Sequence, residues 1–267
     1  MLKIKTLYKT FNPNTVNEKR ALSNLNLHLN KGDFVTVIGG NGAGKSTMLN
    51  AISGVWKPDY GTVEIDGIDV TNMPAYKRAA WLCRVFQDPM KGTAPDMEIA
   101  ENLAISARRG KKRRLVWGCT RSEREEYKKL LAQLDLGLET RLSTKVGLLS
   151  GGQRQAVTLL MATLMKPKLL LLDEHTAALD PKTAAKVLEI TNKLVTENSL
   201  TTLMVTHNMS DAITYGNRLI MMHEGSIVVD ISGEEKKKLT IEQLLQLFEQ
   251  GSGSKFTSDK QMLSKKA

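Results

Sequence analysis

The sequence predicts an α/β fold in which a mixed sheet flanked by helices carries an N-terminal antiparallel β-subdomain and an inserted α-helical subdomain. Leucines alternate with polar residues near the N-terminus, which is typical of a half-buried strand. Short apolar runs at 169–172 and 203–205 are typical of buried parallel strands. Between about residues 88 and 165 this alternation gives way to leucines, alanines and charges, which predicts the helical insert.

The N-terminal third is expected to form strands and one glycine-rich turn. Leu25, Leu27 and Leu29 are separated by Asn26 and His28, a period-two pattern that predicts one strand of an antiparallel region. The segment DFVTVIGG follows as a short apolar strand that runs into glycines, and KSTMLNAISG then has apolar residues at helical spacing. A further β-rich piece, GTVEIDG, comes next. The order strand, glycine-rich loop, helix is therefore expected in this region.

The helical insert and the C-terminal end can also be outlined from local patterns. Thr120 and Glu123 have the spacing of a capping box and predict the start of a helix that continues through Tyr127 and Leu131. Residues 251–267 are small, polar and charged, so we expect a disordered tail. The predicted organisation is one catalytic domain over residues 1–250, with the insert inside it, followed by the tail.

Composition bounds the environment of the chain and leaves its partners open. The 267 residues carry a net charge of +10, which suits nucleic acid, anionic lipid or nucleotide as a partner. No run approaches the roughly 18 to 20 apolar residues that cross a bilayer, and the first residues lack the apolar core of a signal peptide. Cys83 and Cys119 are too few for a disulfide framework. We expect a cytosolic protein.

A phosphate-binding loop is the strongest motif. The string GGNGAGKST matches the pattern G-x-x-x-x-G-K-[ST] and stands between a predicted strand and a predicted helix. Glycines allow successive backbone N–H groups to turn toward phosphate oxygens, Lys45 adds a charge for the outer phosphates, and Ser46 offers a hydroxyl to Mg²⁺. The expected nucleotide-binding residues are Gly39, Gly40, Asn41, Gly42, Ala43, Gly44, Lys45, Ser46 and Thr47.

A pair of carboxylates follows the apolar run at 169–172. Asp173 and Glu174 are expected at the C-terminal end of a buried strand, where ligands of α/β sheets bind. Asp173 would hold the Mg²⁺ shell, and Glu174 would orient or deprotonate the attacking water. A helix cap is the alternative role for such a pair, although a phosphate loop requires a Mg²⁺ partner of this kind.

The string Leu149-Ser150-Gly151-Gly152-Gln153 resembles the signature of the ABC ATPase family, whose core is a RecA-like P-loop NTPase domain. The resemblance covers nearly the whole chain. Further family positions match in order, and they are Phe11, Gln87 in VFQDP, Asp180 in AALD, and His207 after LMVT. The residue after the acidic pair departs from the pattern, since many members have proline where this chain has His175. We assign no role to His175.

The resemblance implies roles for these residues. The signature residues Ser150, Gly151, Gly152 and Gln153 would form a second anion-binding helix start that faces the ATP of a partner subunit. Phe11 would stack on adenine, and Gln87 would reach the metal and the attacking water. His207 would contact the γ-phosphate as a catalytic residue beside Glu174, and Asp180 would communicate across the dimer.

The same resemblance implies a biological setting. The expected function is an ATPase subunit that drives separate membrane permease subunits, with ATP and Mg²⁺ as cofactors and a second ATPase subunit, in a homodimer, as partner. Strings such as LLLLDEHTAALDPKTA resemble bacterial importer ATPases that work with permeases like those for branched-chain amino acids. An extracytoplasmic substrate-binding protein would capture an amino acid, with aromatic ones among the candidates, which the ATPase itself never touches. The chain would lie peripherally on the cytoplasmic face of the cell membrane.

Two questions stay open at the level of sequence. A soluble ABC ATPase that acts on nucleic acid or ribosomes is the alternative function, which the basic charge would suit, although such chains generally carry two nucleotide domains or a long coiled-coil insertion. The run of Arg and Lys over residues 108–114 is expected to be exposed because like charges repel. It is interpreted either as a solvated loop or as a contact with anionic lipid.

Overall fold

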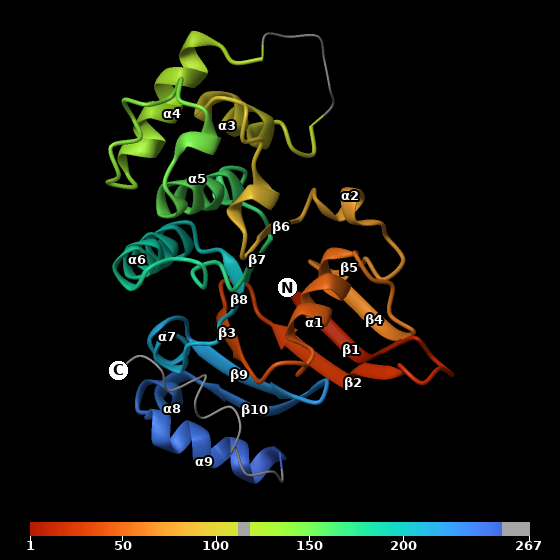
Figure 1. Ribbon diagram of the computed structural model, residues 1–267. Helices are drawn as coiled ribbons and strands as arrows, with labels where there is room; N and C mark the ends of the chain where they lie inside the picture. Colours follow the sequence, from red (N-terminus) through yellow and green to blue (C-terminus); the bar gives the residue numbers. More distant parts are fainter. Residues whose placement is uncertain (112–117, 253–267) are drawn as a thin grey trace.

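The computed structural model describes residues 1–111 and 118–252, and two sheets organise them (Figure 1). The larger sheet has six strands in the order β10-β9-β3-β8-β7-β6, parallel except for the edge strand β10. Its strands are β3 (Phe34–Ile38), β6 (Leu82–Val85), β7 (Leu169–Asp173), β8 (Thr201–Val205), β9 (Arg218–His223) and β10 (Ser226–Ser232). The apolar runs at 169–172 and 203–205 are two of its neighbouring parallel strands, as predicted.

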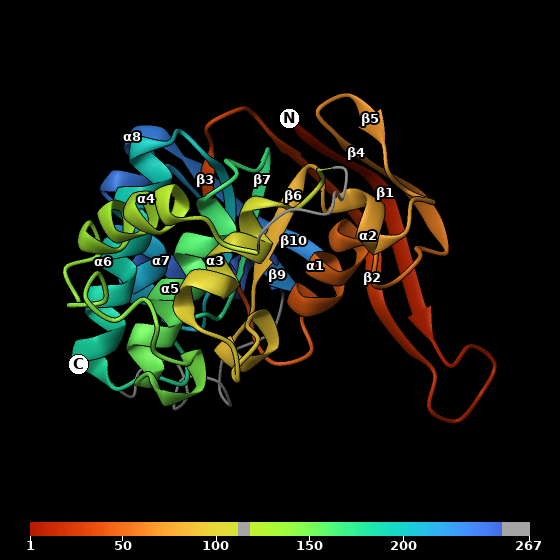
Figure 2. The same ribbon diagram turned by 90° about the horizontal axis from the view of Figure 1, so that it is seen from above.

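The smaller sheet is antiparallel and contains the N-terminus (Figure 2). Its strand order is β2-β1-β4-β5, and the members are β1 (Leu2–Phe11), β2 (Lys19–Leu29), β4 (Tyr60–Ile65) and β5 (Ile68–Asp69). Leu25, Leu27 and Leu29 are buried on β2 while the residues between them are exposed, which confirms the alternating pattern.

The six-stranded sheet is covered on both faces because its central strands alternate between two cores. Leu171 belongs to the cluster that contains α1 (Lys45–Ser53) and the N-terminal sheet. Leu170 belongs to the cluster formed with α5 (Gly151–Thr163) and α6 (Pro181–Glu197). Both leucines are fully buried. This two-sided burial is the reason for the continuous apolar sequence of β7, and the predicted fold class is confirmed.

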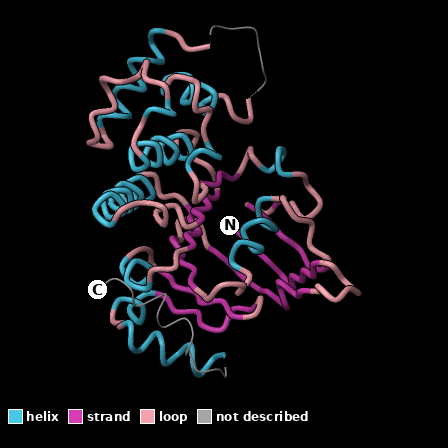
Figure 3. The backbone as a smooth tube through the Cα atoms, in the orientation of Figure 1, coloured by secondary structure: helices cyan, strands magenta, loops and turns pink. Residues whose placement is uncertain are grey.

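In the described part of the predicted insert, which omits residues 112–117, helices, turns and loops occur with one isolated bridge and no strand (Figure 3). The segments are η1 (Pro89–Gly92), α3 (Ile99–Ala107), α4 (Arg121–Ala132), η2 (Val146–Leu148) and α5, whereas the short α2 (Ala75–Arg78) precedes them. The capping box that opens α4 is confirmed: Thr120 accepts a hydrogen bond from the backbone of Glu123, whose carboxylate accepts one from the backbone of Thr120.

Three helices, α7 (Met209–Thr214), α8 (Gly233–Lys237) and α9 (Ile241–Ser252), follow β8. Leu244 and Phe248, four residues apart on α9, pack onto the cluster that contains β9 and β10. The helix includes Gly251 and Ser252, which were expected in the disordered tail, and residues 253–267 lie outside the described part, so the tail stays a prediction. In the part that is described, no helix is both long enough and apolar enough to span a membrane.

Candidate functional site

The glycine-rich loop joins β3 to α1, and its backbone demands glycine at two positions. Gly39 has φ 154°, and a Cβ there would lie 2.4 Å from the carbonyl oxygen of Met222. Gly44, the residue before α1, has φ 99°, and its Cβ would lie 2.6 Å from the carbonyl oxygen of Ala21. The loop therefore packs directly on the backbone of β9 and β2, and α1 begins directly after it.

Lys45 is held over this loop. Its side chain is buried, and its Nζ donates to the carbonyl oxygens of Gly39 and Gly40 at 2.6 and 3.1 Å. These contacts fix the ammonium group at the loop, where an anionic ligand of the backbone amides would meet it. The electrostatic attraction is stronger in such a partly buried place than in bulk water.

A cleft of about 480 Å³ lies over the loop and gathers residues from distant parts of the chain. It is lined by Phe11, Lys19, Ala21, Asn41, Gly42, Ala43, Gly44, Lys45, Ser46, Thr47, Gln87, Asp173 and Glu174. Sequence reasoning missed Lys19, whose Nζ lies 3.4 Å from the place of a Cβ on Gly42. Only the pairing of strands in space brings this exposed lysine of β2 to the loop.

The acidic pair ends β7, as the sequence predicts. Asp173 is the last residue of the strand, and Glu174 follows in the left-handed region with φ 46° while its backbone N–H donates to Val205. This conformation is costly for a residue other than glycine, and such positions concentrate at functional sites. His207, after β8, places its Nδ1 3.9 Å from a carboxylate oxygen of Glu174. The predicted catalytic residues Glu174, His207 and Gln87 thus lie at or beside one cleft.

The cleft also fits a magnesium ion by the chemistry of its donors. Ser46 offers a hydroxyl, Gln87 an amide oxygen and Asp173 a carboxylate, all of them hard oxygen ligands. No cluster of three or more His, Cys, Asp or Glu residues exists among the described residues, so an all-protein metal cage is not built there. Mg²⁺ typically binds through one or two carboxylates and the substrate phosphates, and it would neutralise phosphate charge at this position.

The signature residues lie elsewhere. Ser150 caps α5 by accepting from the backbone of Gln153, and the side chain of Gln153 accepts from the backbone of Ser150 in return. Gly152 lies so close to Thr183 of α6 that a Cβ would meet its methyl group at 2.1 Å. None of these residues lines the cleft. The structure therefore does not bring the signature to the phosphate loop of the same chain.

Asp180 lies beside the signature as the N-cap of α6. Its carboxylate accepts hydrogen bonds from Thr183, and these bonds hold the pKa of Asp180 below its ordinary value. Phe11, by contrast, lines the cleft and packs edge-on against Trp56, with ring centroids 5.2 Å apart. The predicted stacking residue is thus placed near the loop, and the roles of both side chains toward nucleotide stay predictions.

His175 has a structural role. It is 2% exposed, and its Nε2 lies 2.9 Å from the hydroxyl oxygen of Thr191. Because the Thr191 hydroxyl donates to Val187, it accepts from His175, which fixes the Nε2–H tautomer. Burial lowers the pKa of His175 to about 4, so the ring is neutral at pH 7.

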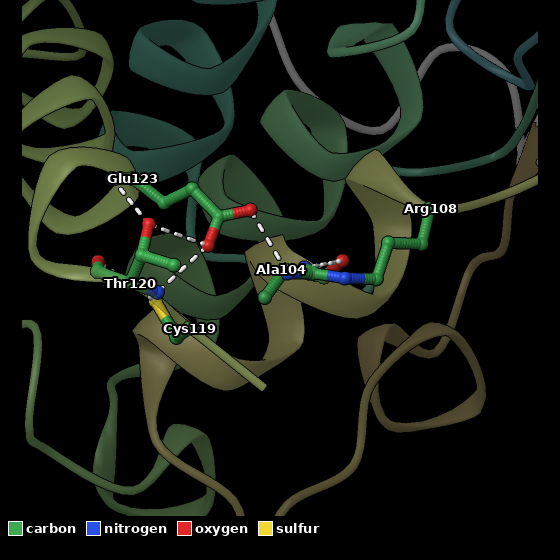
Figure 4. Close-up of polar contacts among 5 residues, drawn as sticks. All are labelled: Ala104, Arg108, Cys119, Thr120 and Glu123. Carbon is green, nitrogen blue, oxygen red and sulfur yellow. Dashed lines mark hydrogen bonds and ion pairs between the residues drawn. The ribbon is translucent and has the colours of Figure 1, made fainter. Parts of the chain in front are cut away.

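The prediction that the whole basic run is exposed is wrong for its first two residues. Arg108 and Arg109 are half-buried, against the expectation that the whole run is exposed. Arg108 donates to the carbonyl oxygen of Ala104 and to the carboxylate of Glu123, which also receives the Thr120 backbone N–H (Figure 4). Arg109 contacts Cys83 of β6. Fixed acceptors outweigh like-charge repulsion for these two cations. Lys111 is exposed, and the expectation for Lys112, Arg113 and Arg114 lies outside the described residues.

A glycine-rich phosphate loop after β3 of a mostly parallel sheet, with an acidic pair at the end of β7, which β8 separates from β3, defines a P-loop nucleotide-binding protein. Within that class, residues 22–177 match the family model described as ABC transporter. The chain belongs to the ABC transporter family and is one of its ATP-hydrolysing, ATP-binding cassettes coupled to transport.

Named relatives extend this assignment. The chain is 48% identical over 250 residues, 93% of its length and 99% of the relative's, to the tyrosine transport ATP-binding protein of Clostridioides difficile. It is 33% identical over 235 residues to the spermidine/putrescine import ATP-binding protein PotA of Haemophilus influenzae. That match covers 88% of this chain but only 59% of the polyamine protein.

Solved structures agree with the fold. The dimeric post-hydrolysis state of the ATP-binding cassette MJ0796, bound to ADP and Pi, is 32% identical and superimposes with a TM-score of 0.74 over 87% of this chain and 98% of that one. The ADP conformation of MJ1267, an ATP-binding cassette of an ABC transporter, is 29% identical with a TM-score of 0.76 over 93% and 98% of the two chains.

Proposed function

We propose that this chain is the ATPase subunit of an importer for an amino acid, and that two copies hydrolyse ATP between them to drive separate permease subunits. The observation that carries the proposal is the separation of two anion-binding features. The phosphate loop and the acidic pair share one cleft, whereas the signature helix start, with exposed Ser150 and Gly151, is not part of it. A second copy arranged head to tail would bring its signature to the first copy's cleft.

We propose a division of labour in that site, which the shared lining of the cleft supports. Lys45 and the amides of the loop bind phosphate, and Ser46, Gln87 and Asp173 are the oxygen donors toward Mg²⁺. Glu174 positions or deprotonates the water, with His207 beside it. Phe11 is proposed as the adenine contact and Asp180 as a contact across the dimer.

A permease-binding surface is proposed at two exposed apolar side chains, one just after Gln87 in sequence and one just before the signature. Met90 and Leu148 are 39% and 73% exposed. Arg154 links them, because its guanidinium contacts the Met90 sulfur and donates to the carbonyls of Gly147 and Leu149 on either side of Leu148. A loop that senses nucleotide through Gln87 is thereby joined to a surface suited to an apolar partner. Binding there would place the chain peripherally on the cytoplasmic face of the membrane.

The proposed cargo is an amino acid of the aromatic class, captured outside the membrane by a separate binding protein. Support comes from the tyrosine transport function named for the relative that matches along almost its whole length. Both named relatives are transport or import proteins, which favours a permease over nucleic acid as the partner. Uptake of labelled tyrosine that persists unchanged in cells lacking the gene would contradict this cargo.

The head-to-tail arrangement is tested by mixing two inactive variants. Lys45→Ala removes the phosphate-facing charge, and Ser150→Arg places bulk and charge where the partner's γ-phosphate would dock. In a mixed dimer, one composite site carries both defects and the other carries neither. We expect each variant alone to lack ATP-dependent dimers and the mixture to recover them, as measured by size-exclusion chromatography with ATP. Folded parents whose mixture remains monomeric would contradict the arrangement.

A further inference from the structure

One arginine of the cleft region has no part in the signature or phosphate-loop motifs. Arg84 lies on β6, and its side chain is 10% exposed. Its two terminal nitrogens donate in different directions, to the side-chain oxygen of Asn50 on α1 at 2.6 Å and to Oδ2 of Asp173 at 2.5 Å. One guanidinium therefore ties together the helix after the phosphate loop and the strand that ends in the metal-binding carboxylate.

The sheet register explains how Arg84 reaches that carboxylate. Arg84 pairs with Leu171 in the parallel ladder of β6 and β7, and Asp173 lies two residues further along β7. Residues two apart share a face, and this face is the one that packs toward α1. A side chain as long as arginine spans the distance, and the planar fork can serve Asn50 and Asp173 together.

The bond from Arg84 to Asp173 is strong, but one donor of the guanidinium has no hydrogen-bond partner among the described residues. A charge-assisted hydrogen bond in a half-buried place restrains the carboxylate more than a neutral one would. The Nε of Arg84 is buried without a hydrogen-bond partner among the described residues. A pair optimised only for stability would satisfy this donor, since a buried unsatisfied group is costly. The guanidinium is oriented so that its two terminal nitrogens bond Asn50 and Asp173 while Nε stays unbonded. This orientation holds the Asp173 carboxylate in place.

Arg84 also lies close to the loop that would respond to the permease. Gln87 follows it by three residues, and Phe86 between them places its ring 5.0 Å from the Arg84 guanidinium carbon. The carbonyl of Phe86 receives a hydrogen bond from Gln155 of α5. The arginine thus connects the start of the Gln87 loop with Asp173.

We propose that Arg84 is a positioning residue that holds Oδ2 of Asp173 and leaves Oδ1 for the hydration shell of Mg²⁺, an inference that rests on the proposed ATPase site. Partners that orient a metal-binding group typically contribute about 10- to 100-fold to metal affinity. Loss of Arg84 frees the carboxylate to rotate, so metal binding weakens although Asp173 itself is intact. A lysine keeps the charge but cannot bridge both partners, and it restores only part of the effect.

The test measures metal binding directly, with Mn²⁺ as the probe and the full chain loaded with ADP. Electron paramagnetic resonance of free Mn²⁺ gives its dissociation constant. We expect Arg84→Met to raise that constant about tenfold and Arg84→Lys to raise it about threefold. The matched control is Arg218→Met, which breaks another arginine–aspartate pair, to Asp230, far along the sheet and outside the cleft. It should leave the constant unchanged.

The possible results separate the alternatives. Equal Mn²⁺ affinity in wild type and Arg84→Met, with both folded by circular dichroism, would overturn the inference and leave Arg84 a structural tie. Tighter binding in Arg84→Met would also overturn it, because Arg84 would then compete with the metal. If Arg84→Met does not fold, Arg84→Lys and Asn50→Ala, which removes the other arm, provide the same comparison. A wild-type protein that binds no Mn²⁺ with ADP would instead contradict the proposed site as a whole.

Discussion

Two helix starts in this molecule are suited to anions, and they are built differently. The phosphate loop shares its cleft with residues from β1, β2, the end of β7 and the Gln87 segment. At the start of α5, the capping box of Ser150 and Gln153 bonds the backbone N–H groups of both residues. Ser150 and Gly151 are exposed there. In the proposed head-to-tail dimer each place supplies half of a site, and variants at the two places test that proposal.

The largest effect is expected at the enclosed cleft. Glu174→Gln keeps the size of the side chain but removes its basicity, so hydrolysis should fall about 10³-fold while ATP still binds. The variant should accumulate as an ATP-bound dimer, detected by size-exclusion chromatography together with a phosphate-release assay. Hydrolysis at the wild-type rate would show that another group positions the water.

The next effect compares how variants at the phosphate loop and at the signature change the affinity for ATP. Lys45→Ala should weaken ATP binding about 100-fold, since a charged hydrogen-bonding partner is lost. Ser150→Arg should leave this affinity unchanged, because Ser150 does not line the cleft of its own chain. Titration with a fluorescent ATP analogue, at protein concentrations too low for dimers, measures both. An equal loss in the two variants would mean that the signature contacts nucleotide within one chain.

A smaller effect is expected at His175, the buried neighbour of Glu174, and it concerns stability rather than hydrolysis. The folded-state pKa of His175, about 4, lies below the ordinary value of 6.5, so only the unfolded chain binds a proton between these values. Stability contributed by the neutral ring is present above pH 6.5 and is lost as the pH falls toward 4. The loss should reach about 2 kcal/mol at pH 5. Urea unfolding of wild type and His175→Gln should show a shallower pH dependence in the variant.

The smallest effect compares two capping boxes of the same design. Ser150→Ala and Thr120→Ala each remove an N-cap and should lower the free energy of unfolding by about 1 kcal/mol. Only Ser150→Ala should also slow hydrolysis by the folded protein, because Thr120 caps a helix remote from the cleft. If both variants hydrolyse ATP like the wild type, the Ser150 hydroxyl serves only as a cap.

Much of this arrangement could be predicted from local sequence. The glycine-rich string that contains Gly39 and Gly44 predicts a turn with positive φ values, and the Thr120–Glu123 spacing forms a capping box wherever the helix lies. The apolar run before Asp173 predicts a buried strand that ends in a carboxylate. These features depend on periodicity and on hydrogen bonds between residues close in sequence, so a short segment contains the information.

Contacts between distant segments were decided by the tertiary structure. Lys19 reaches the loop only because β2 runs beside it, and Arg84 reaches Asp173 only through the register of β6 on β7. Arg108 was expected in solvent, yet Glu123 and a helix carbonyl are placed to receive it. Composition and spacing predicted which residues of this chain bind phosphate and metal. Which charges meet was decided by strand order and packing, because a charge is attracted by neighbours in space whatever their distance in sequence.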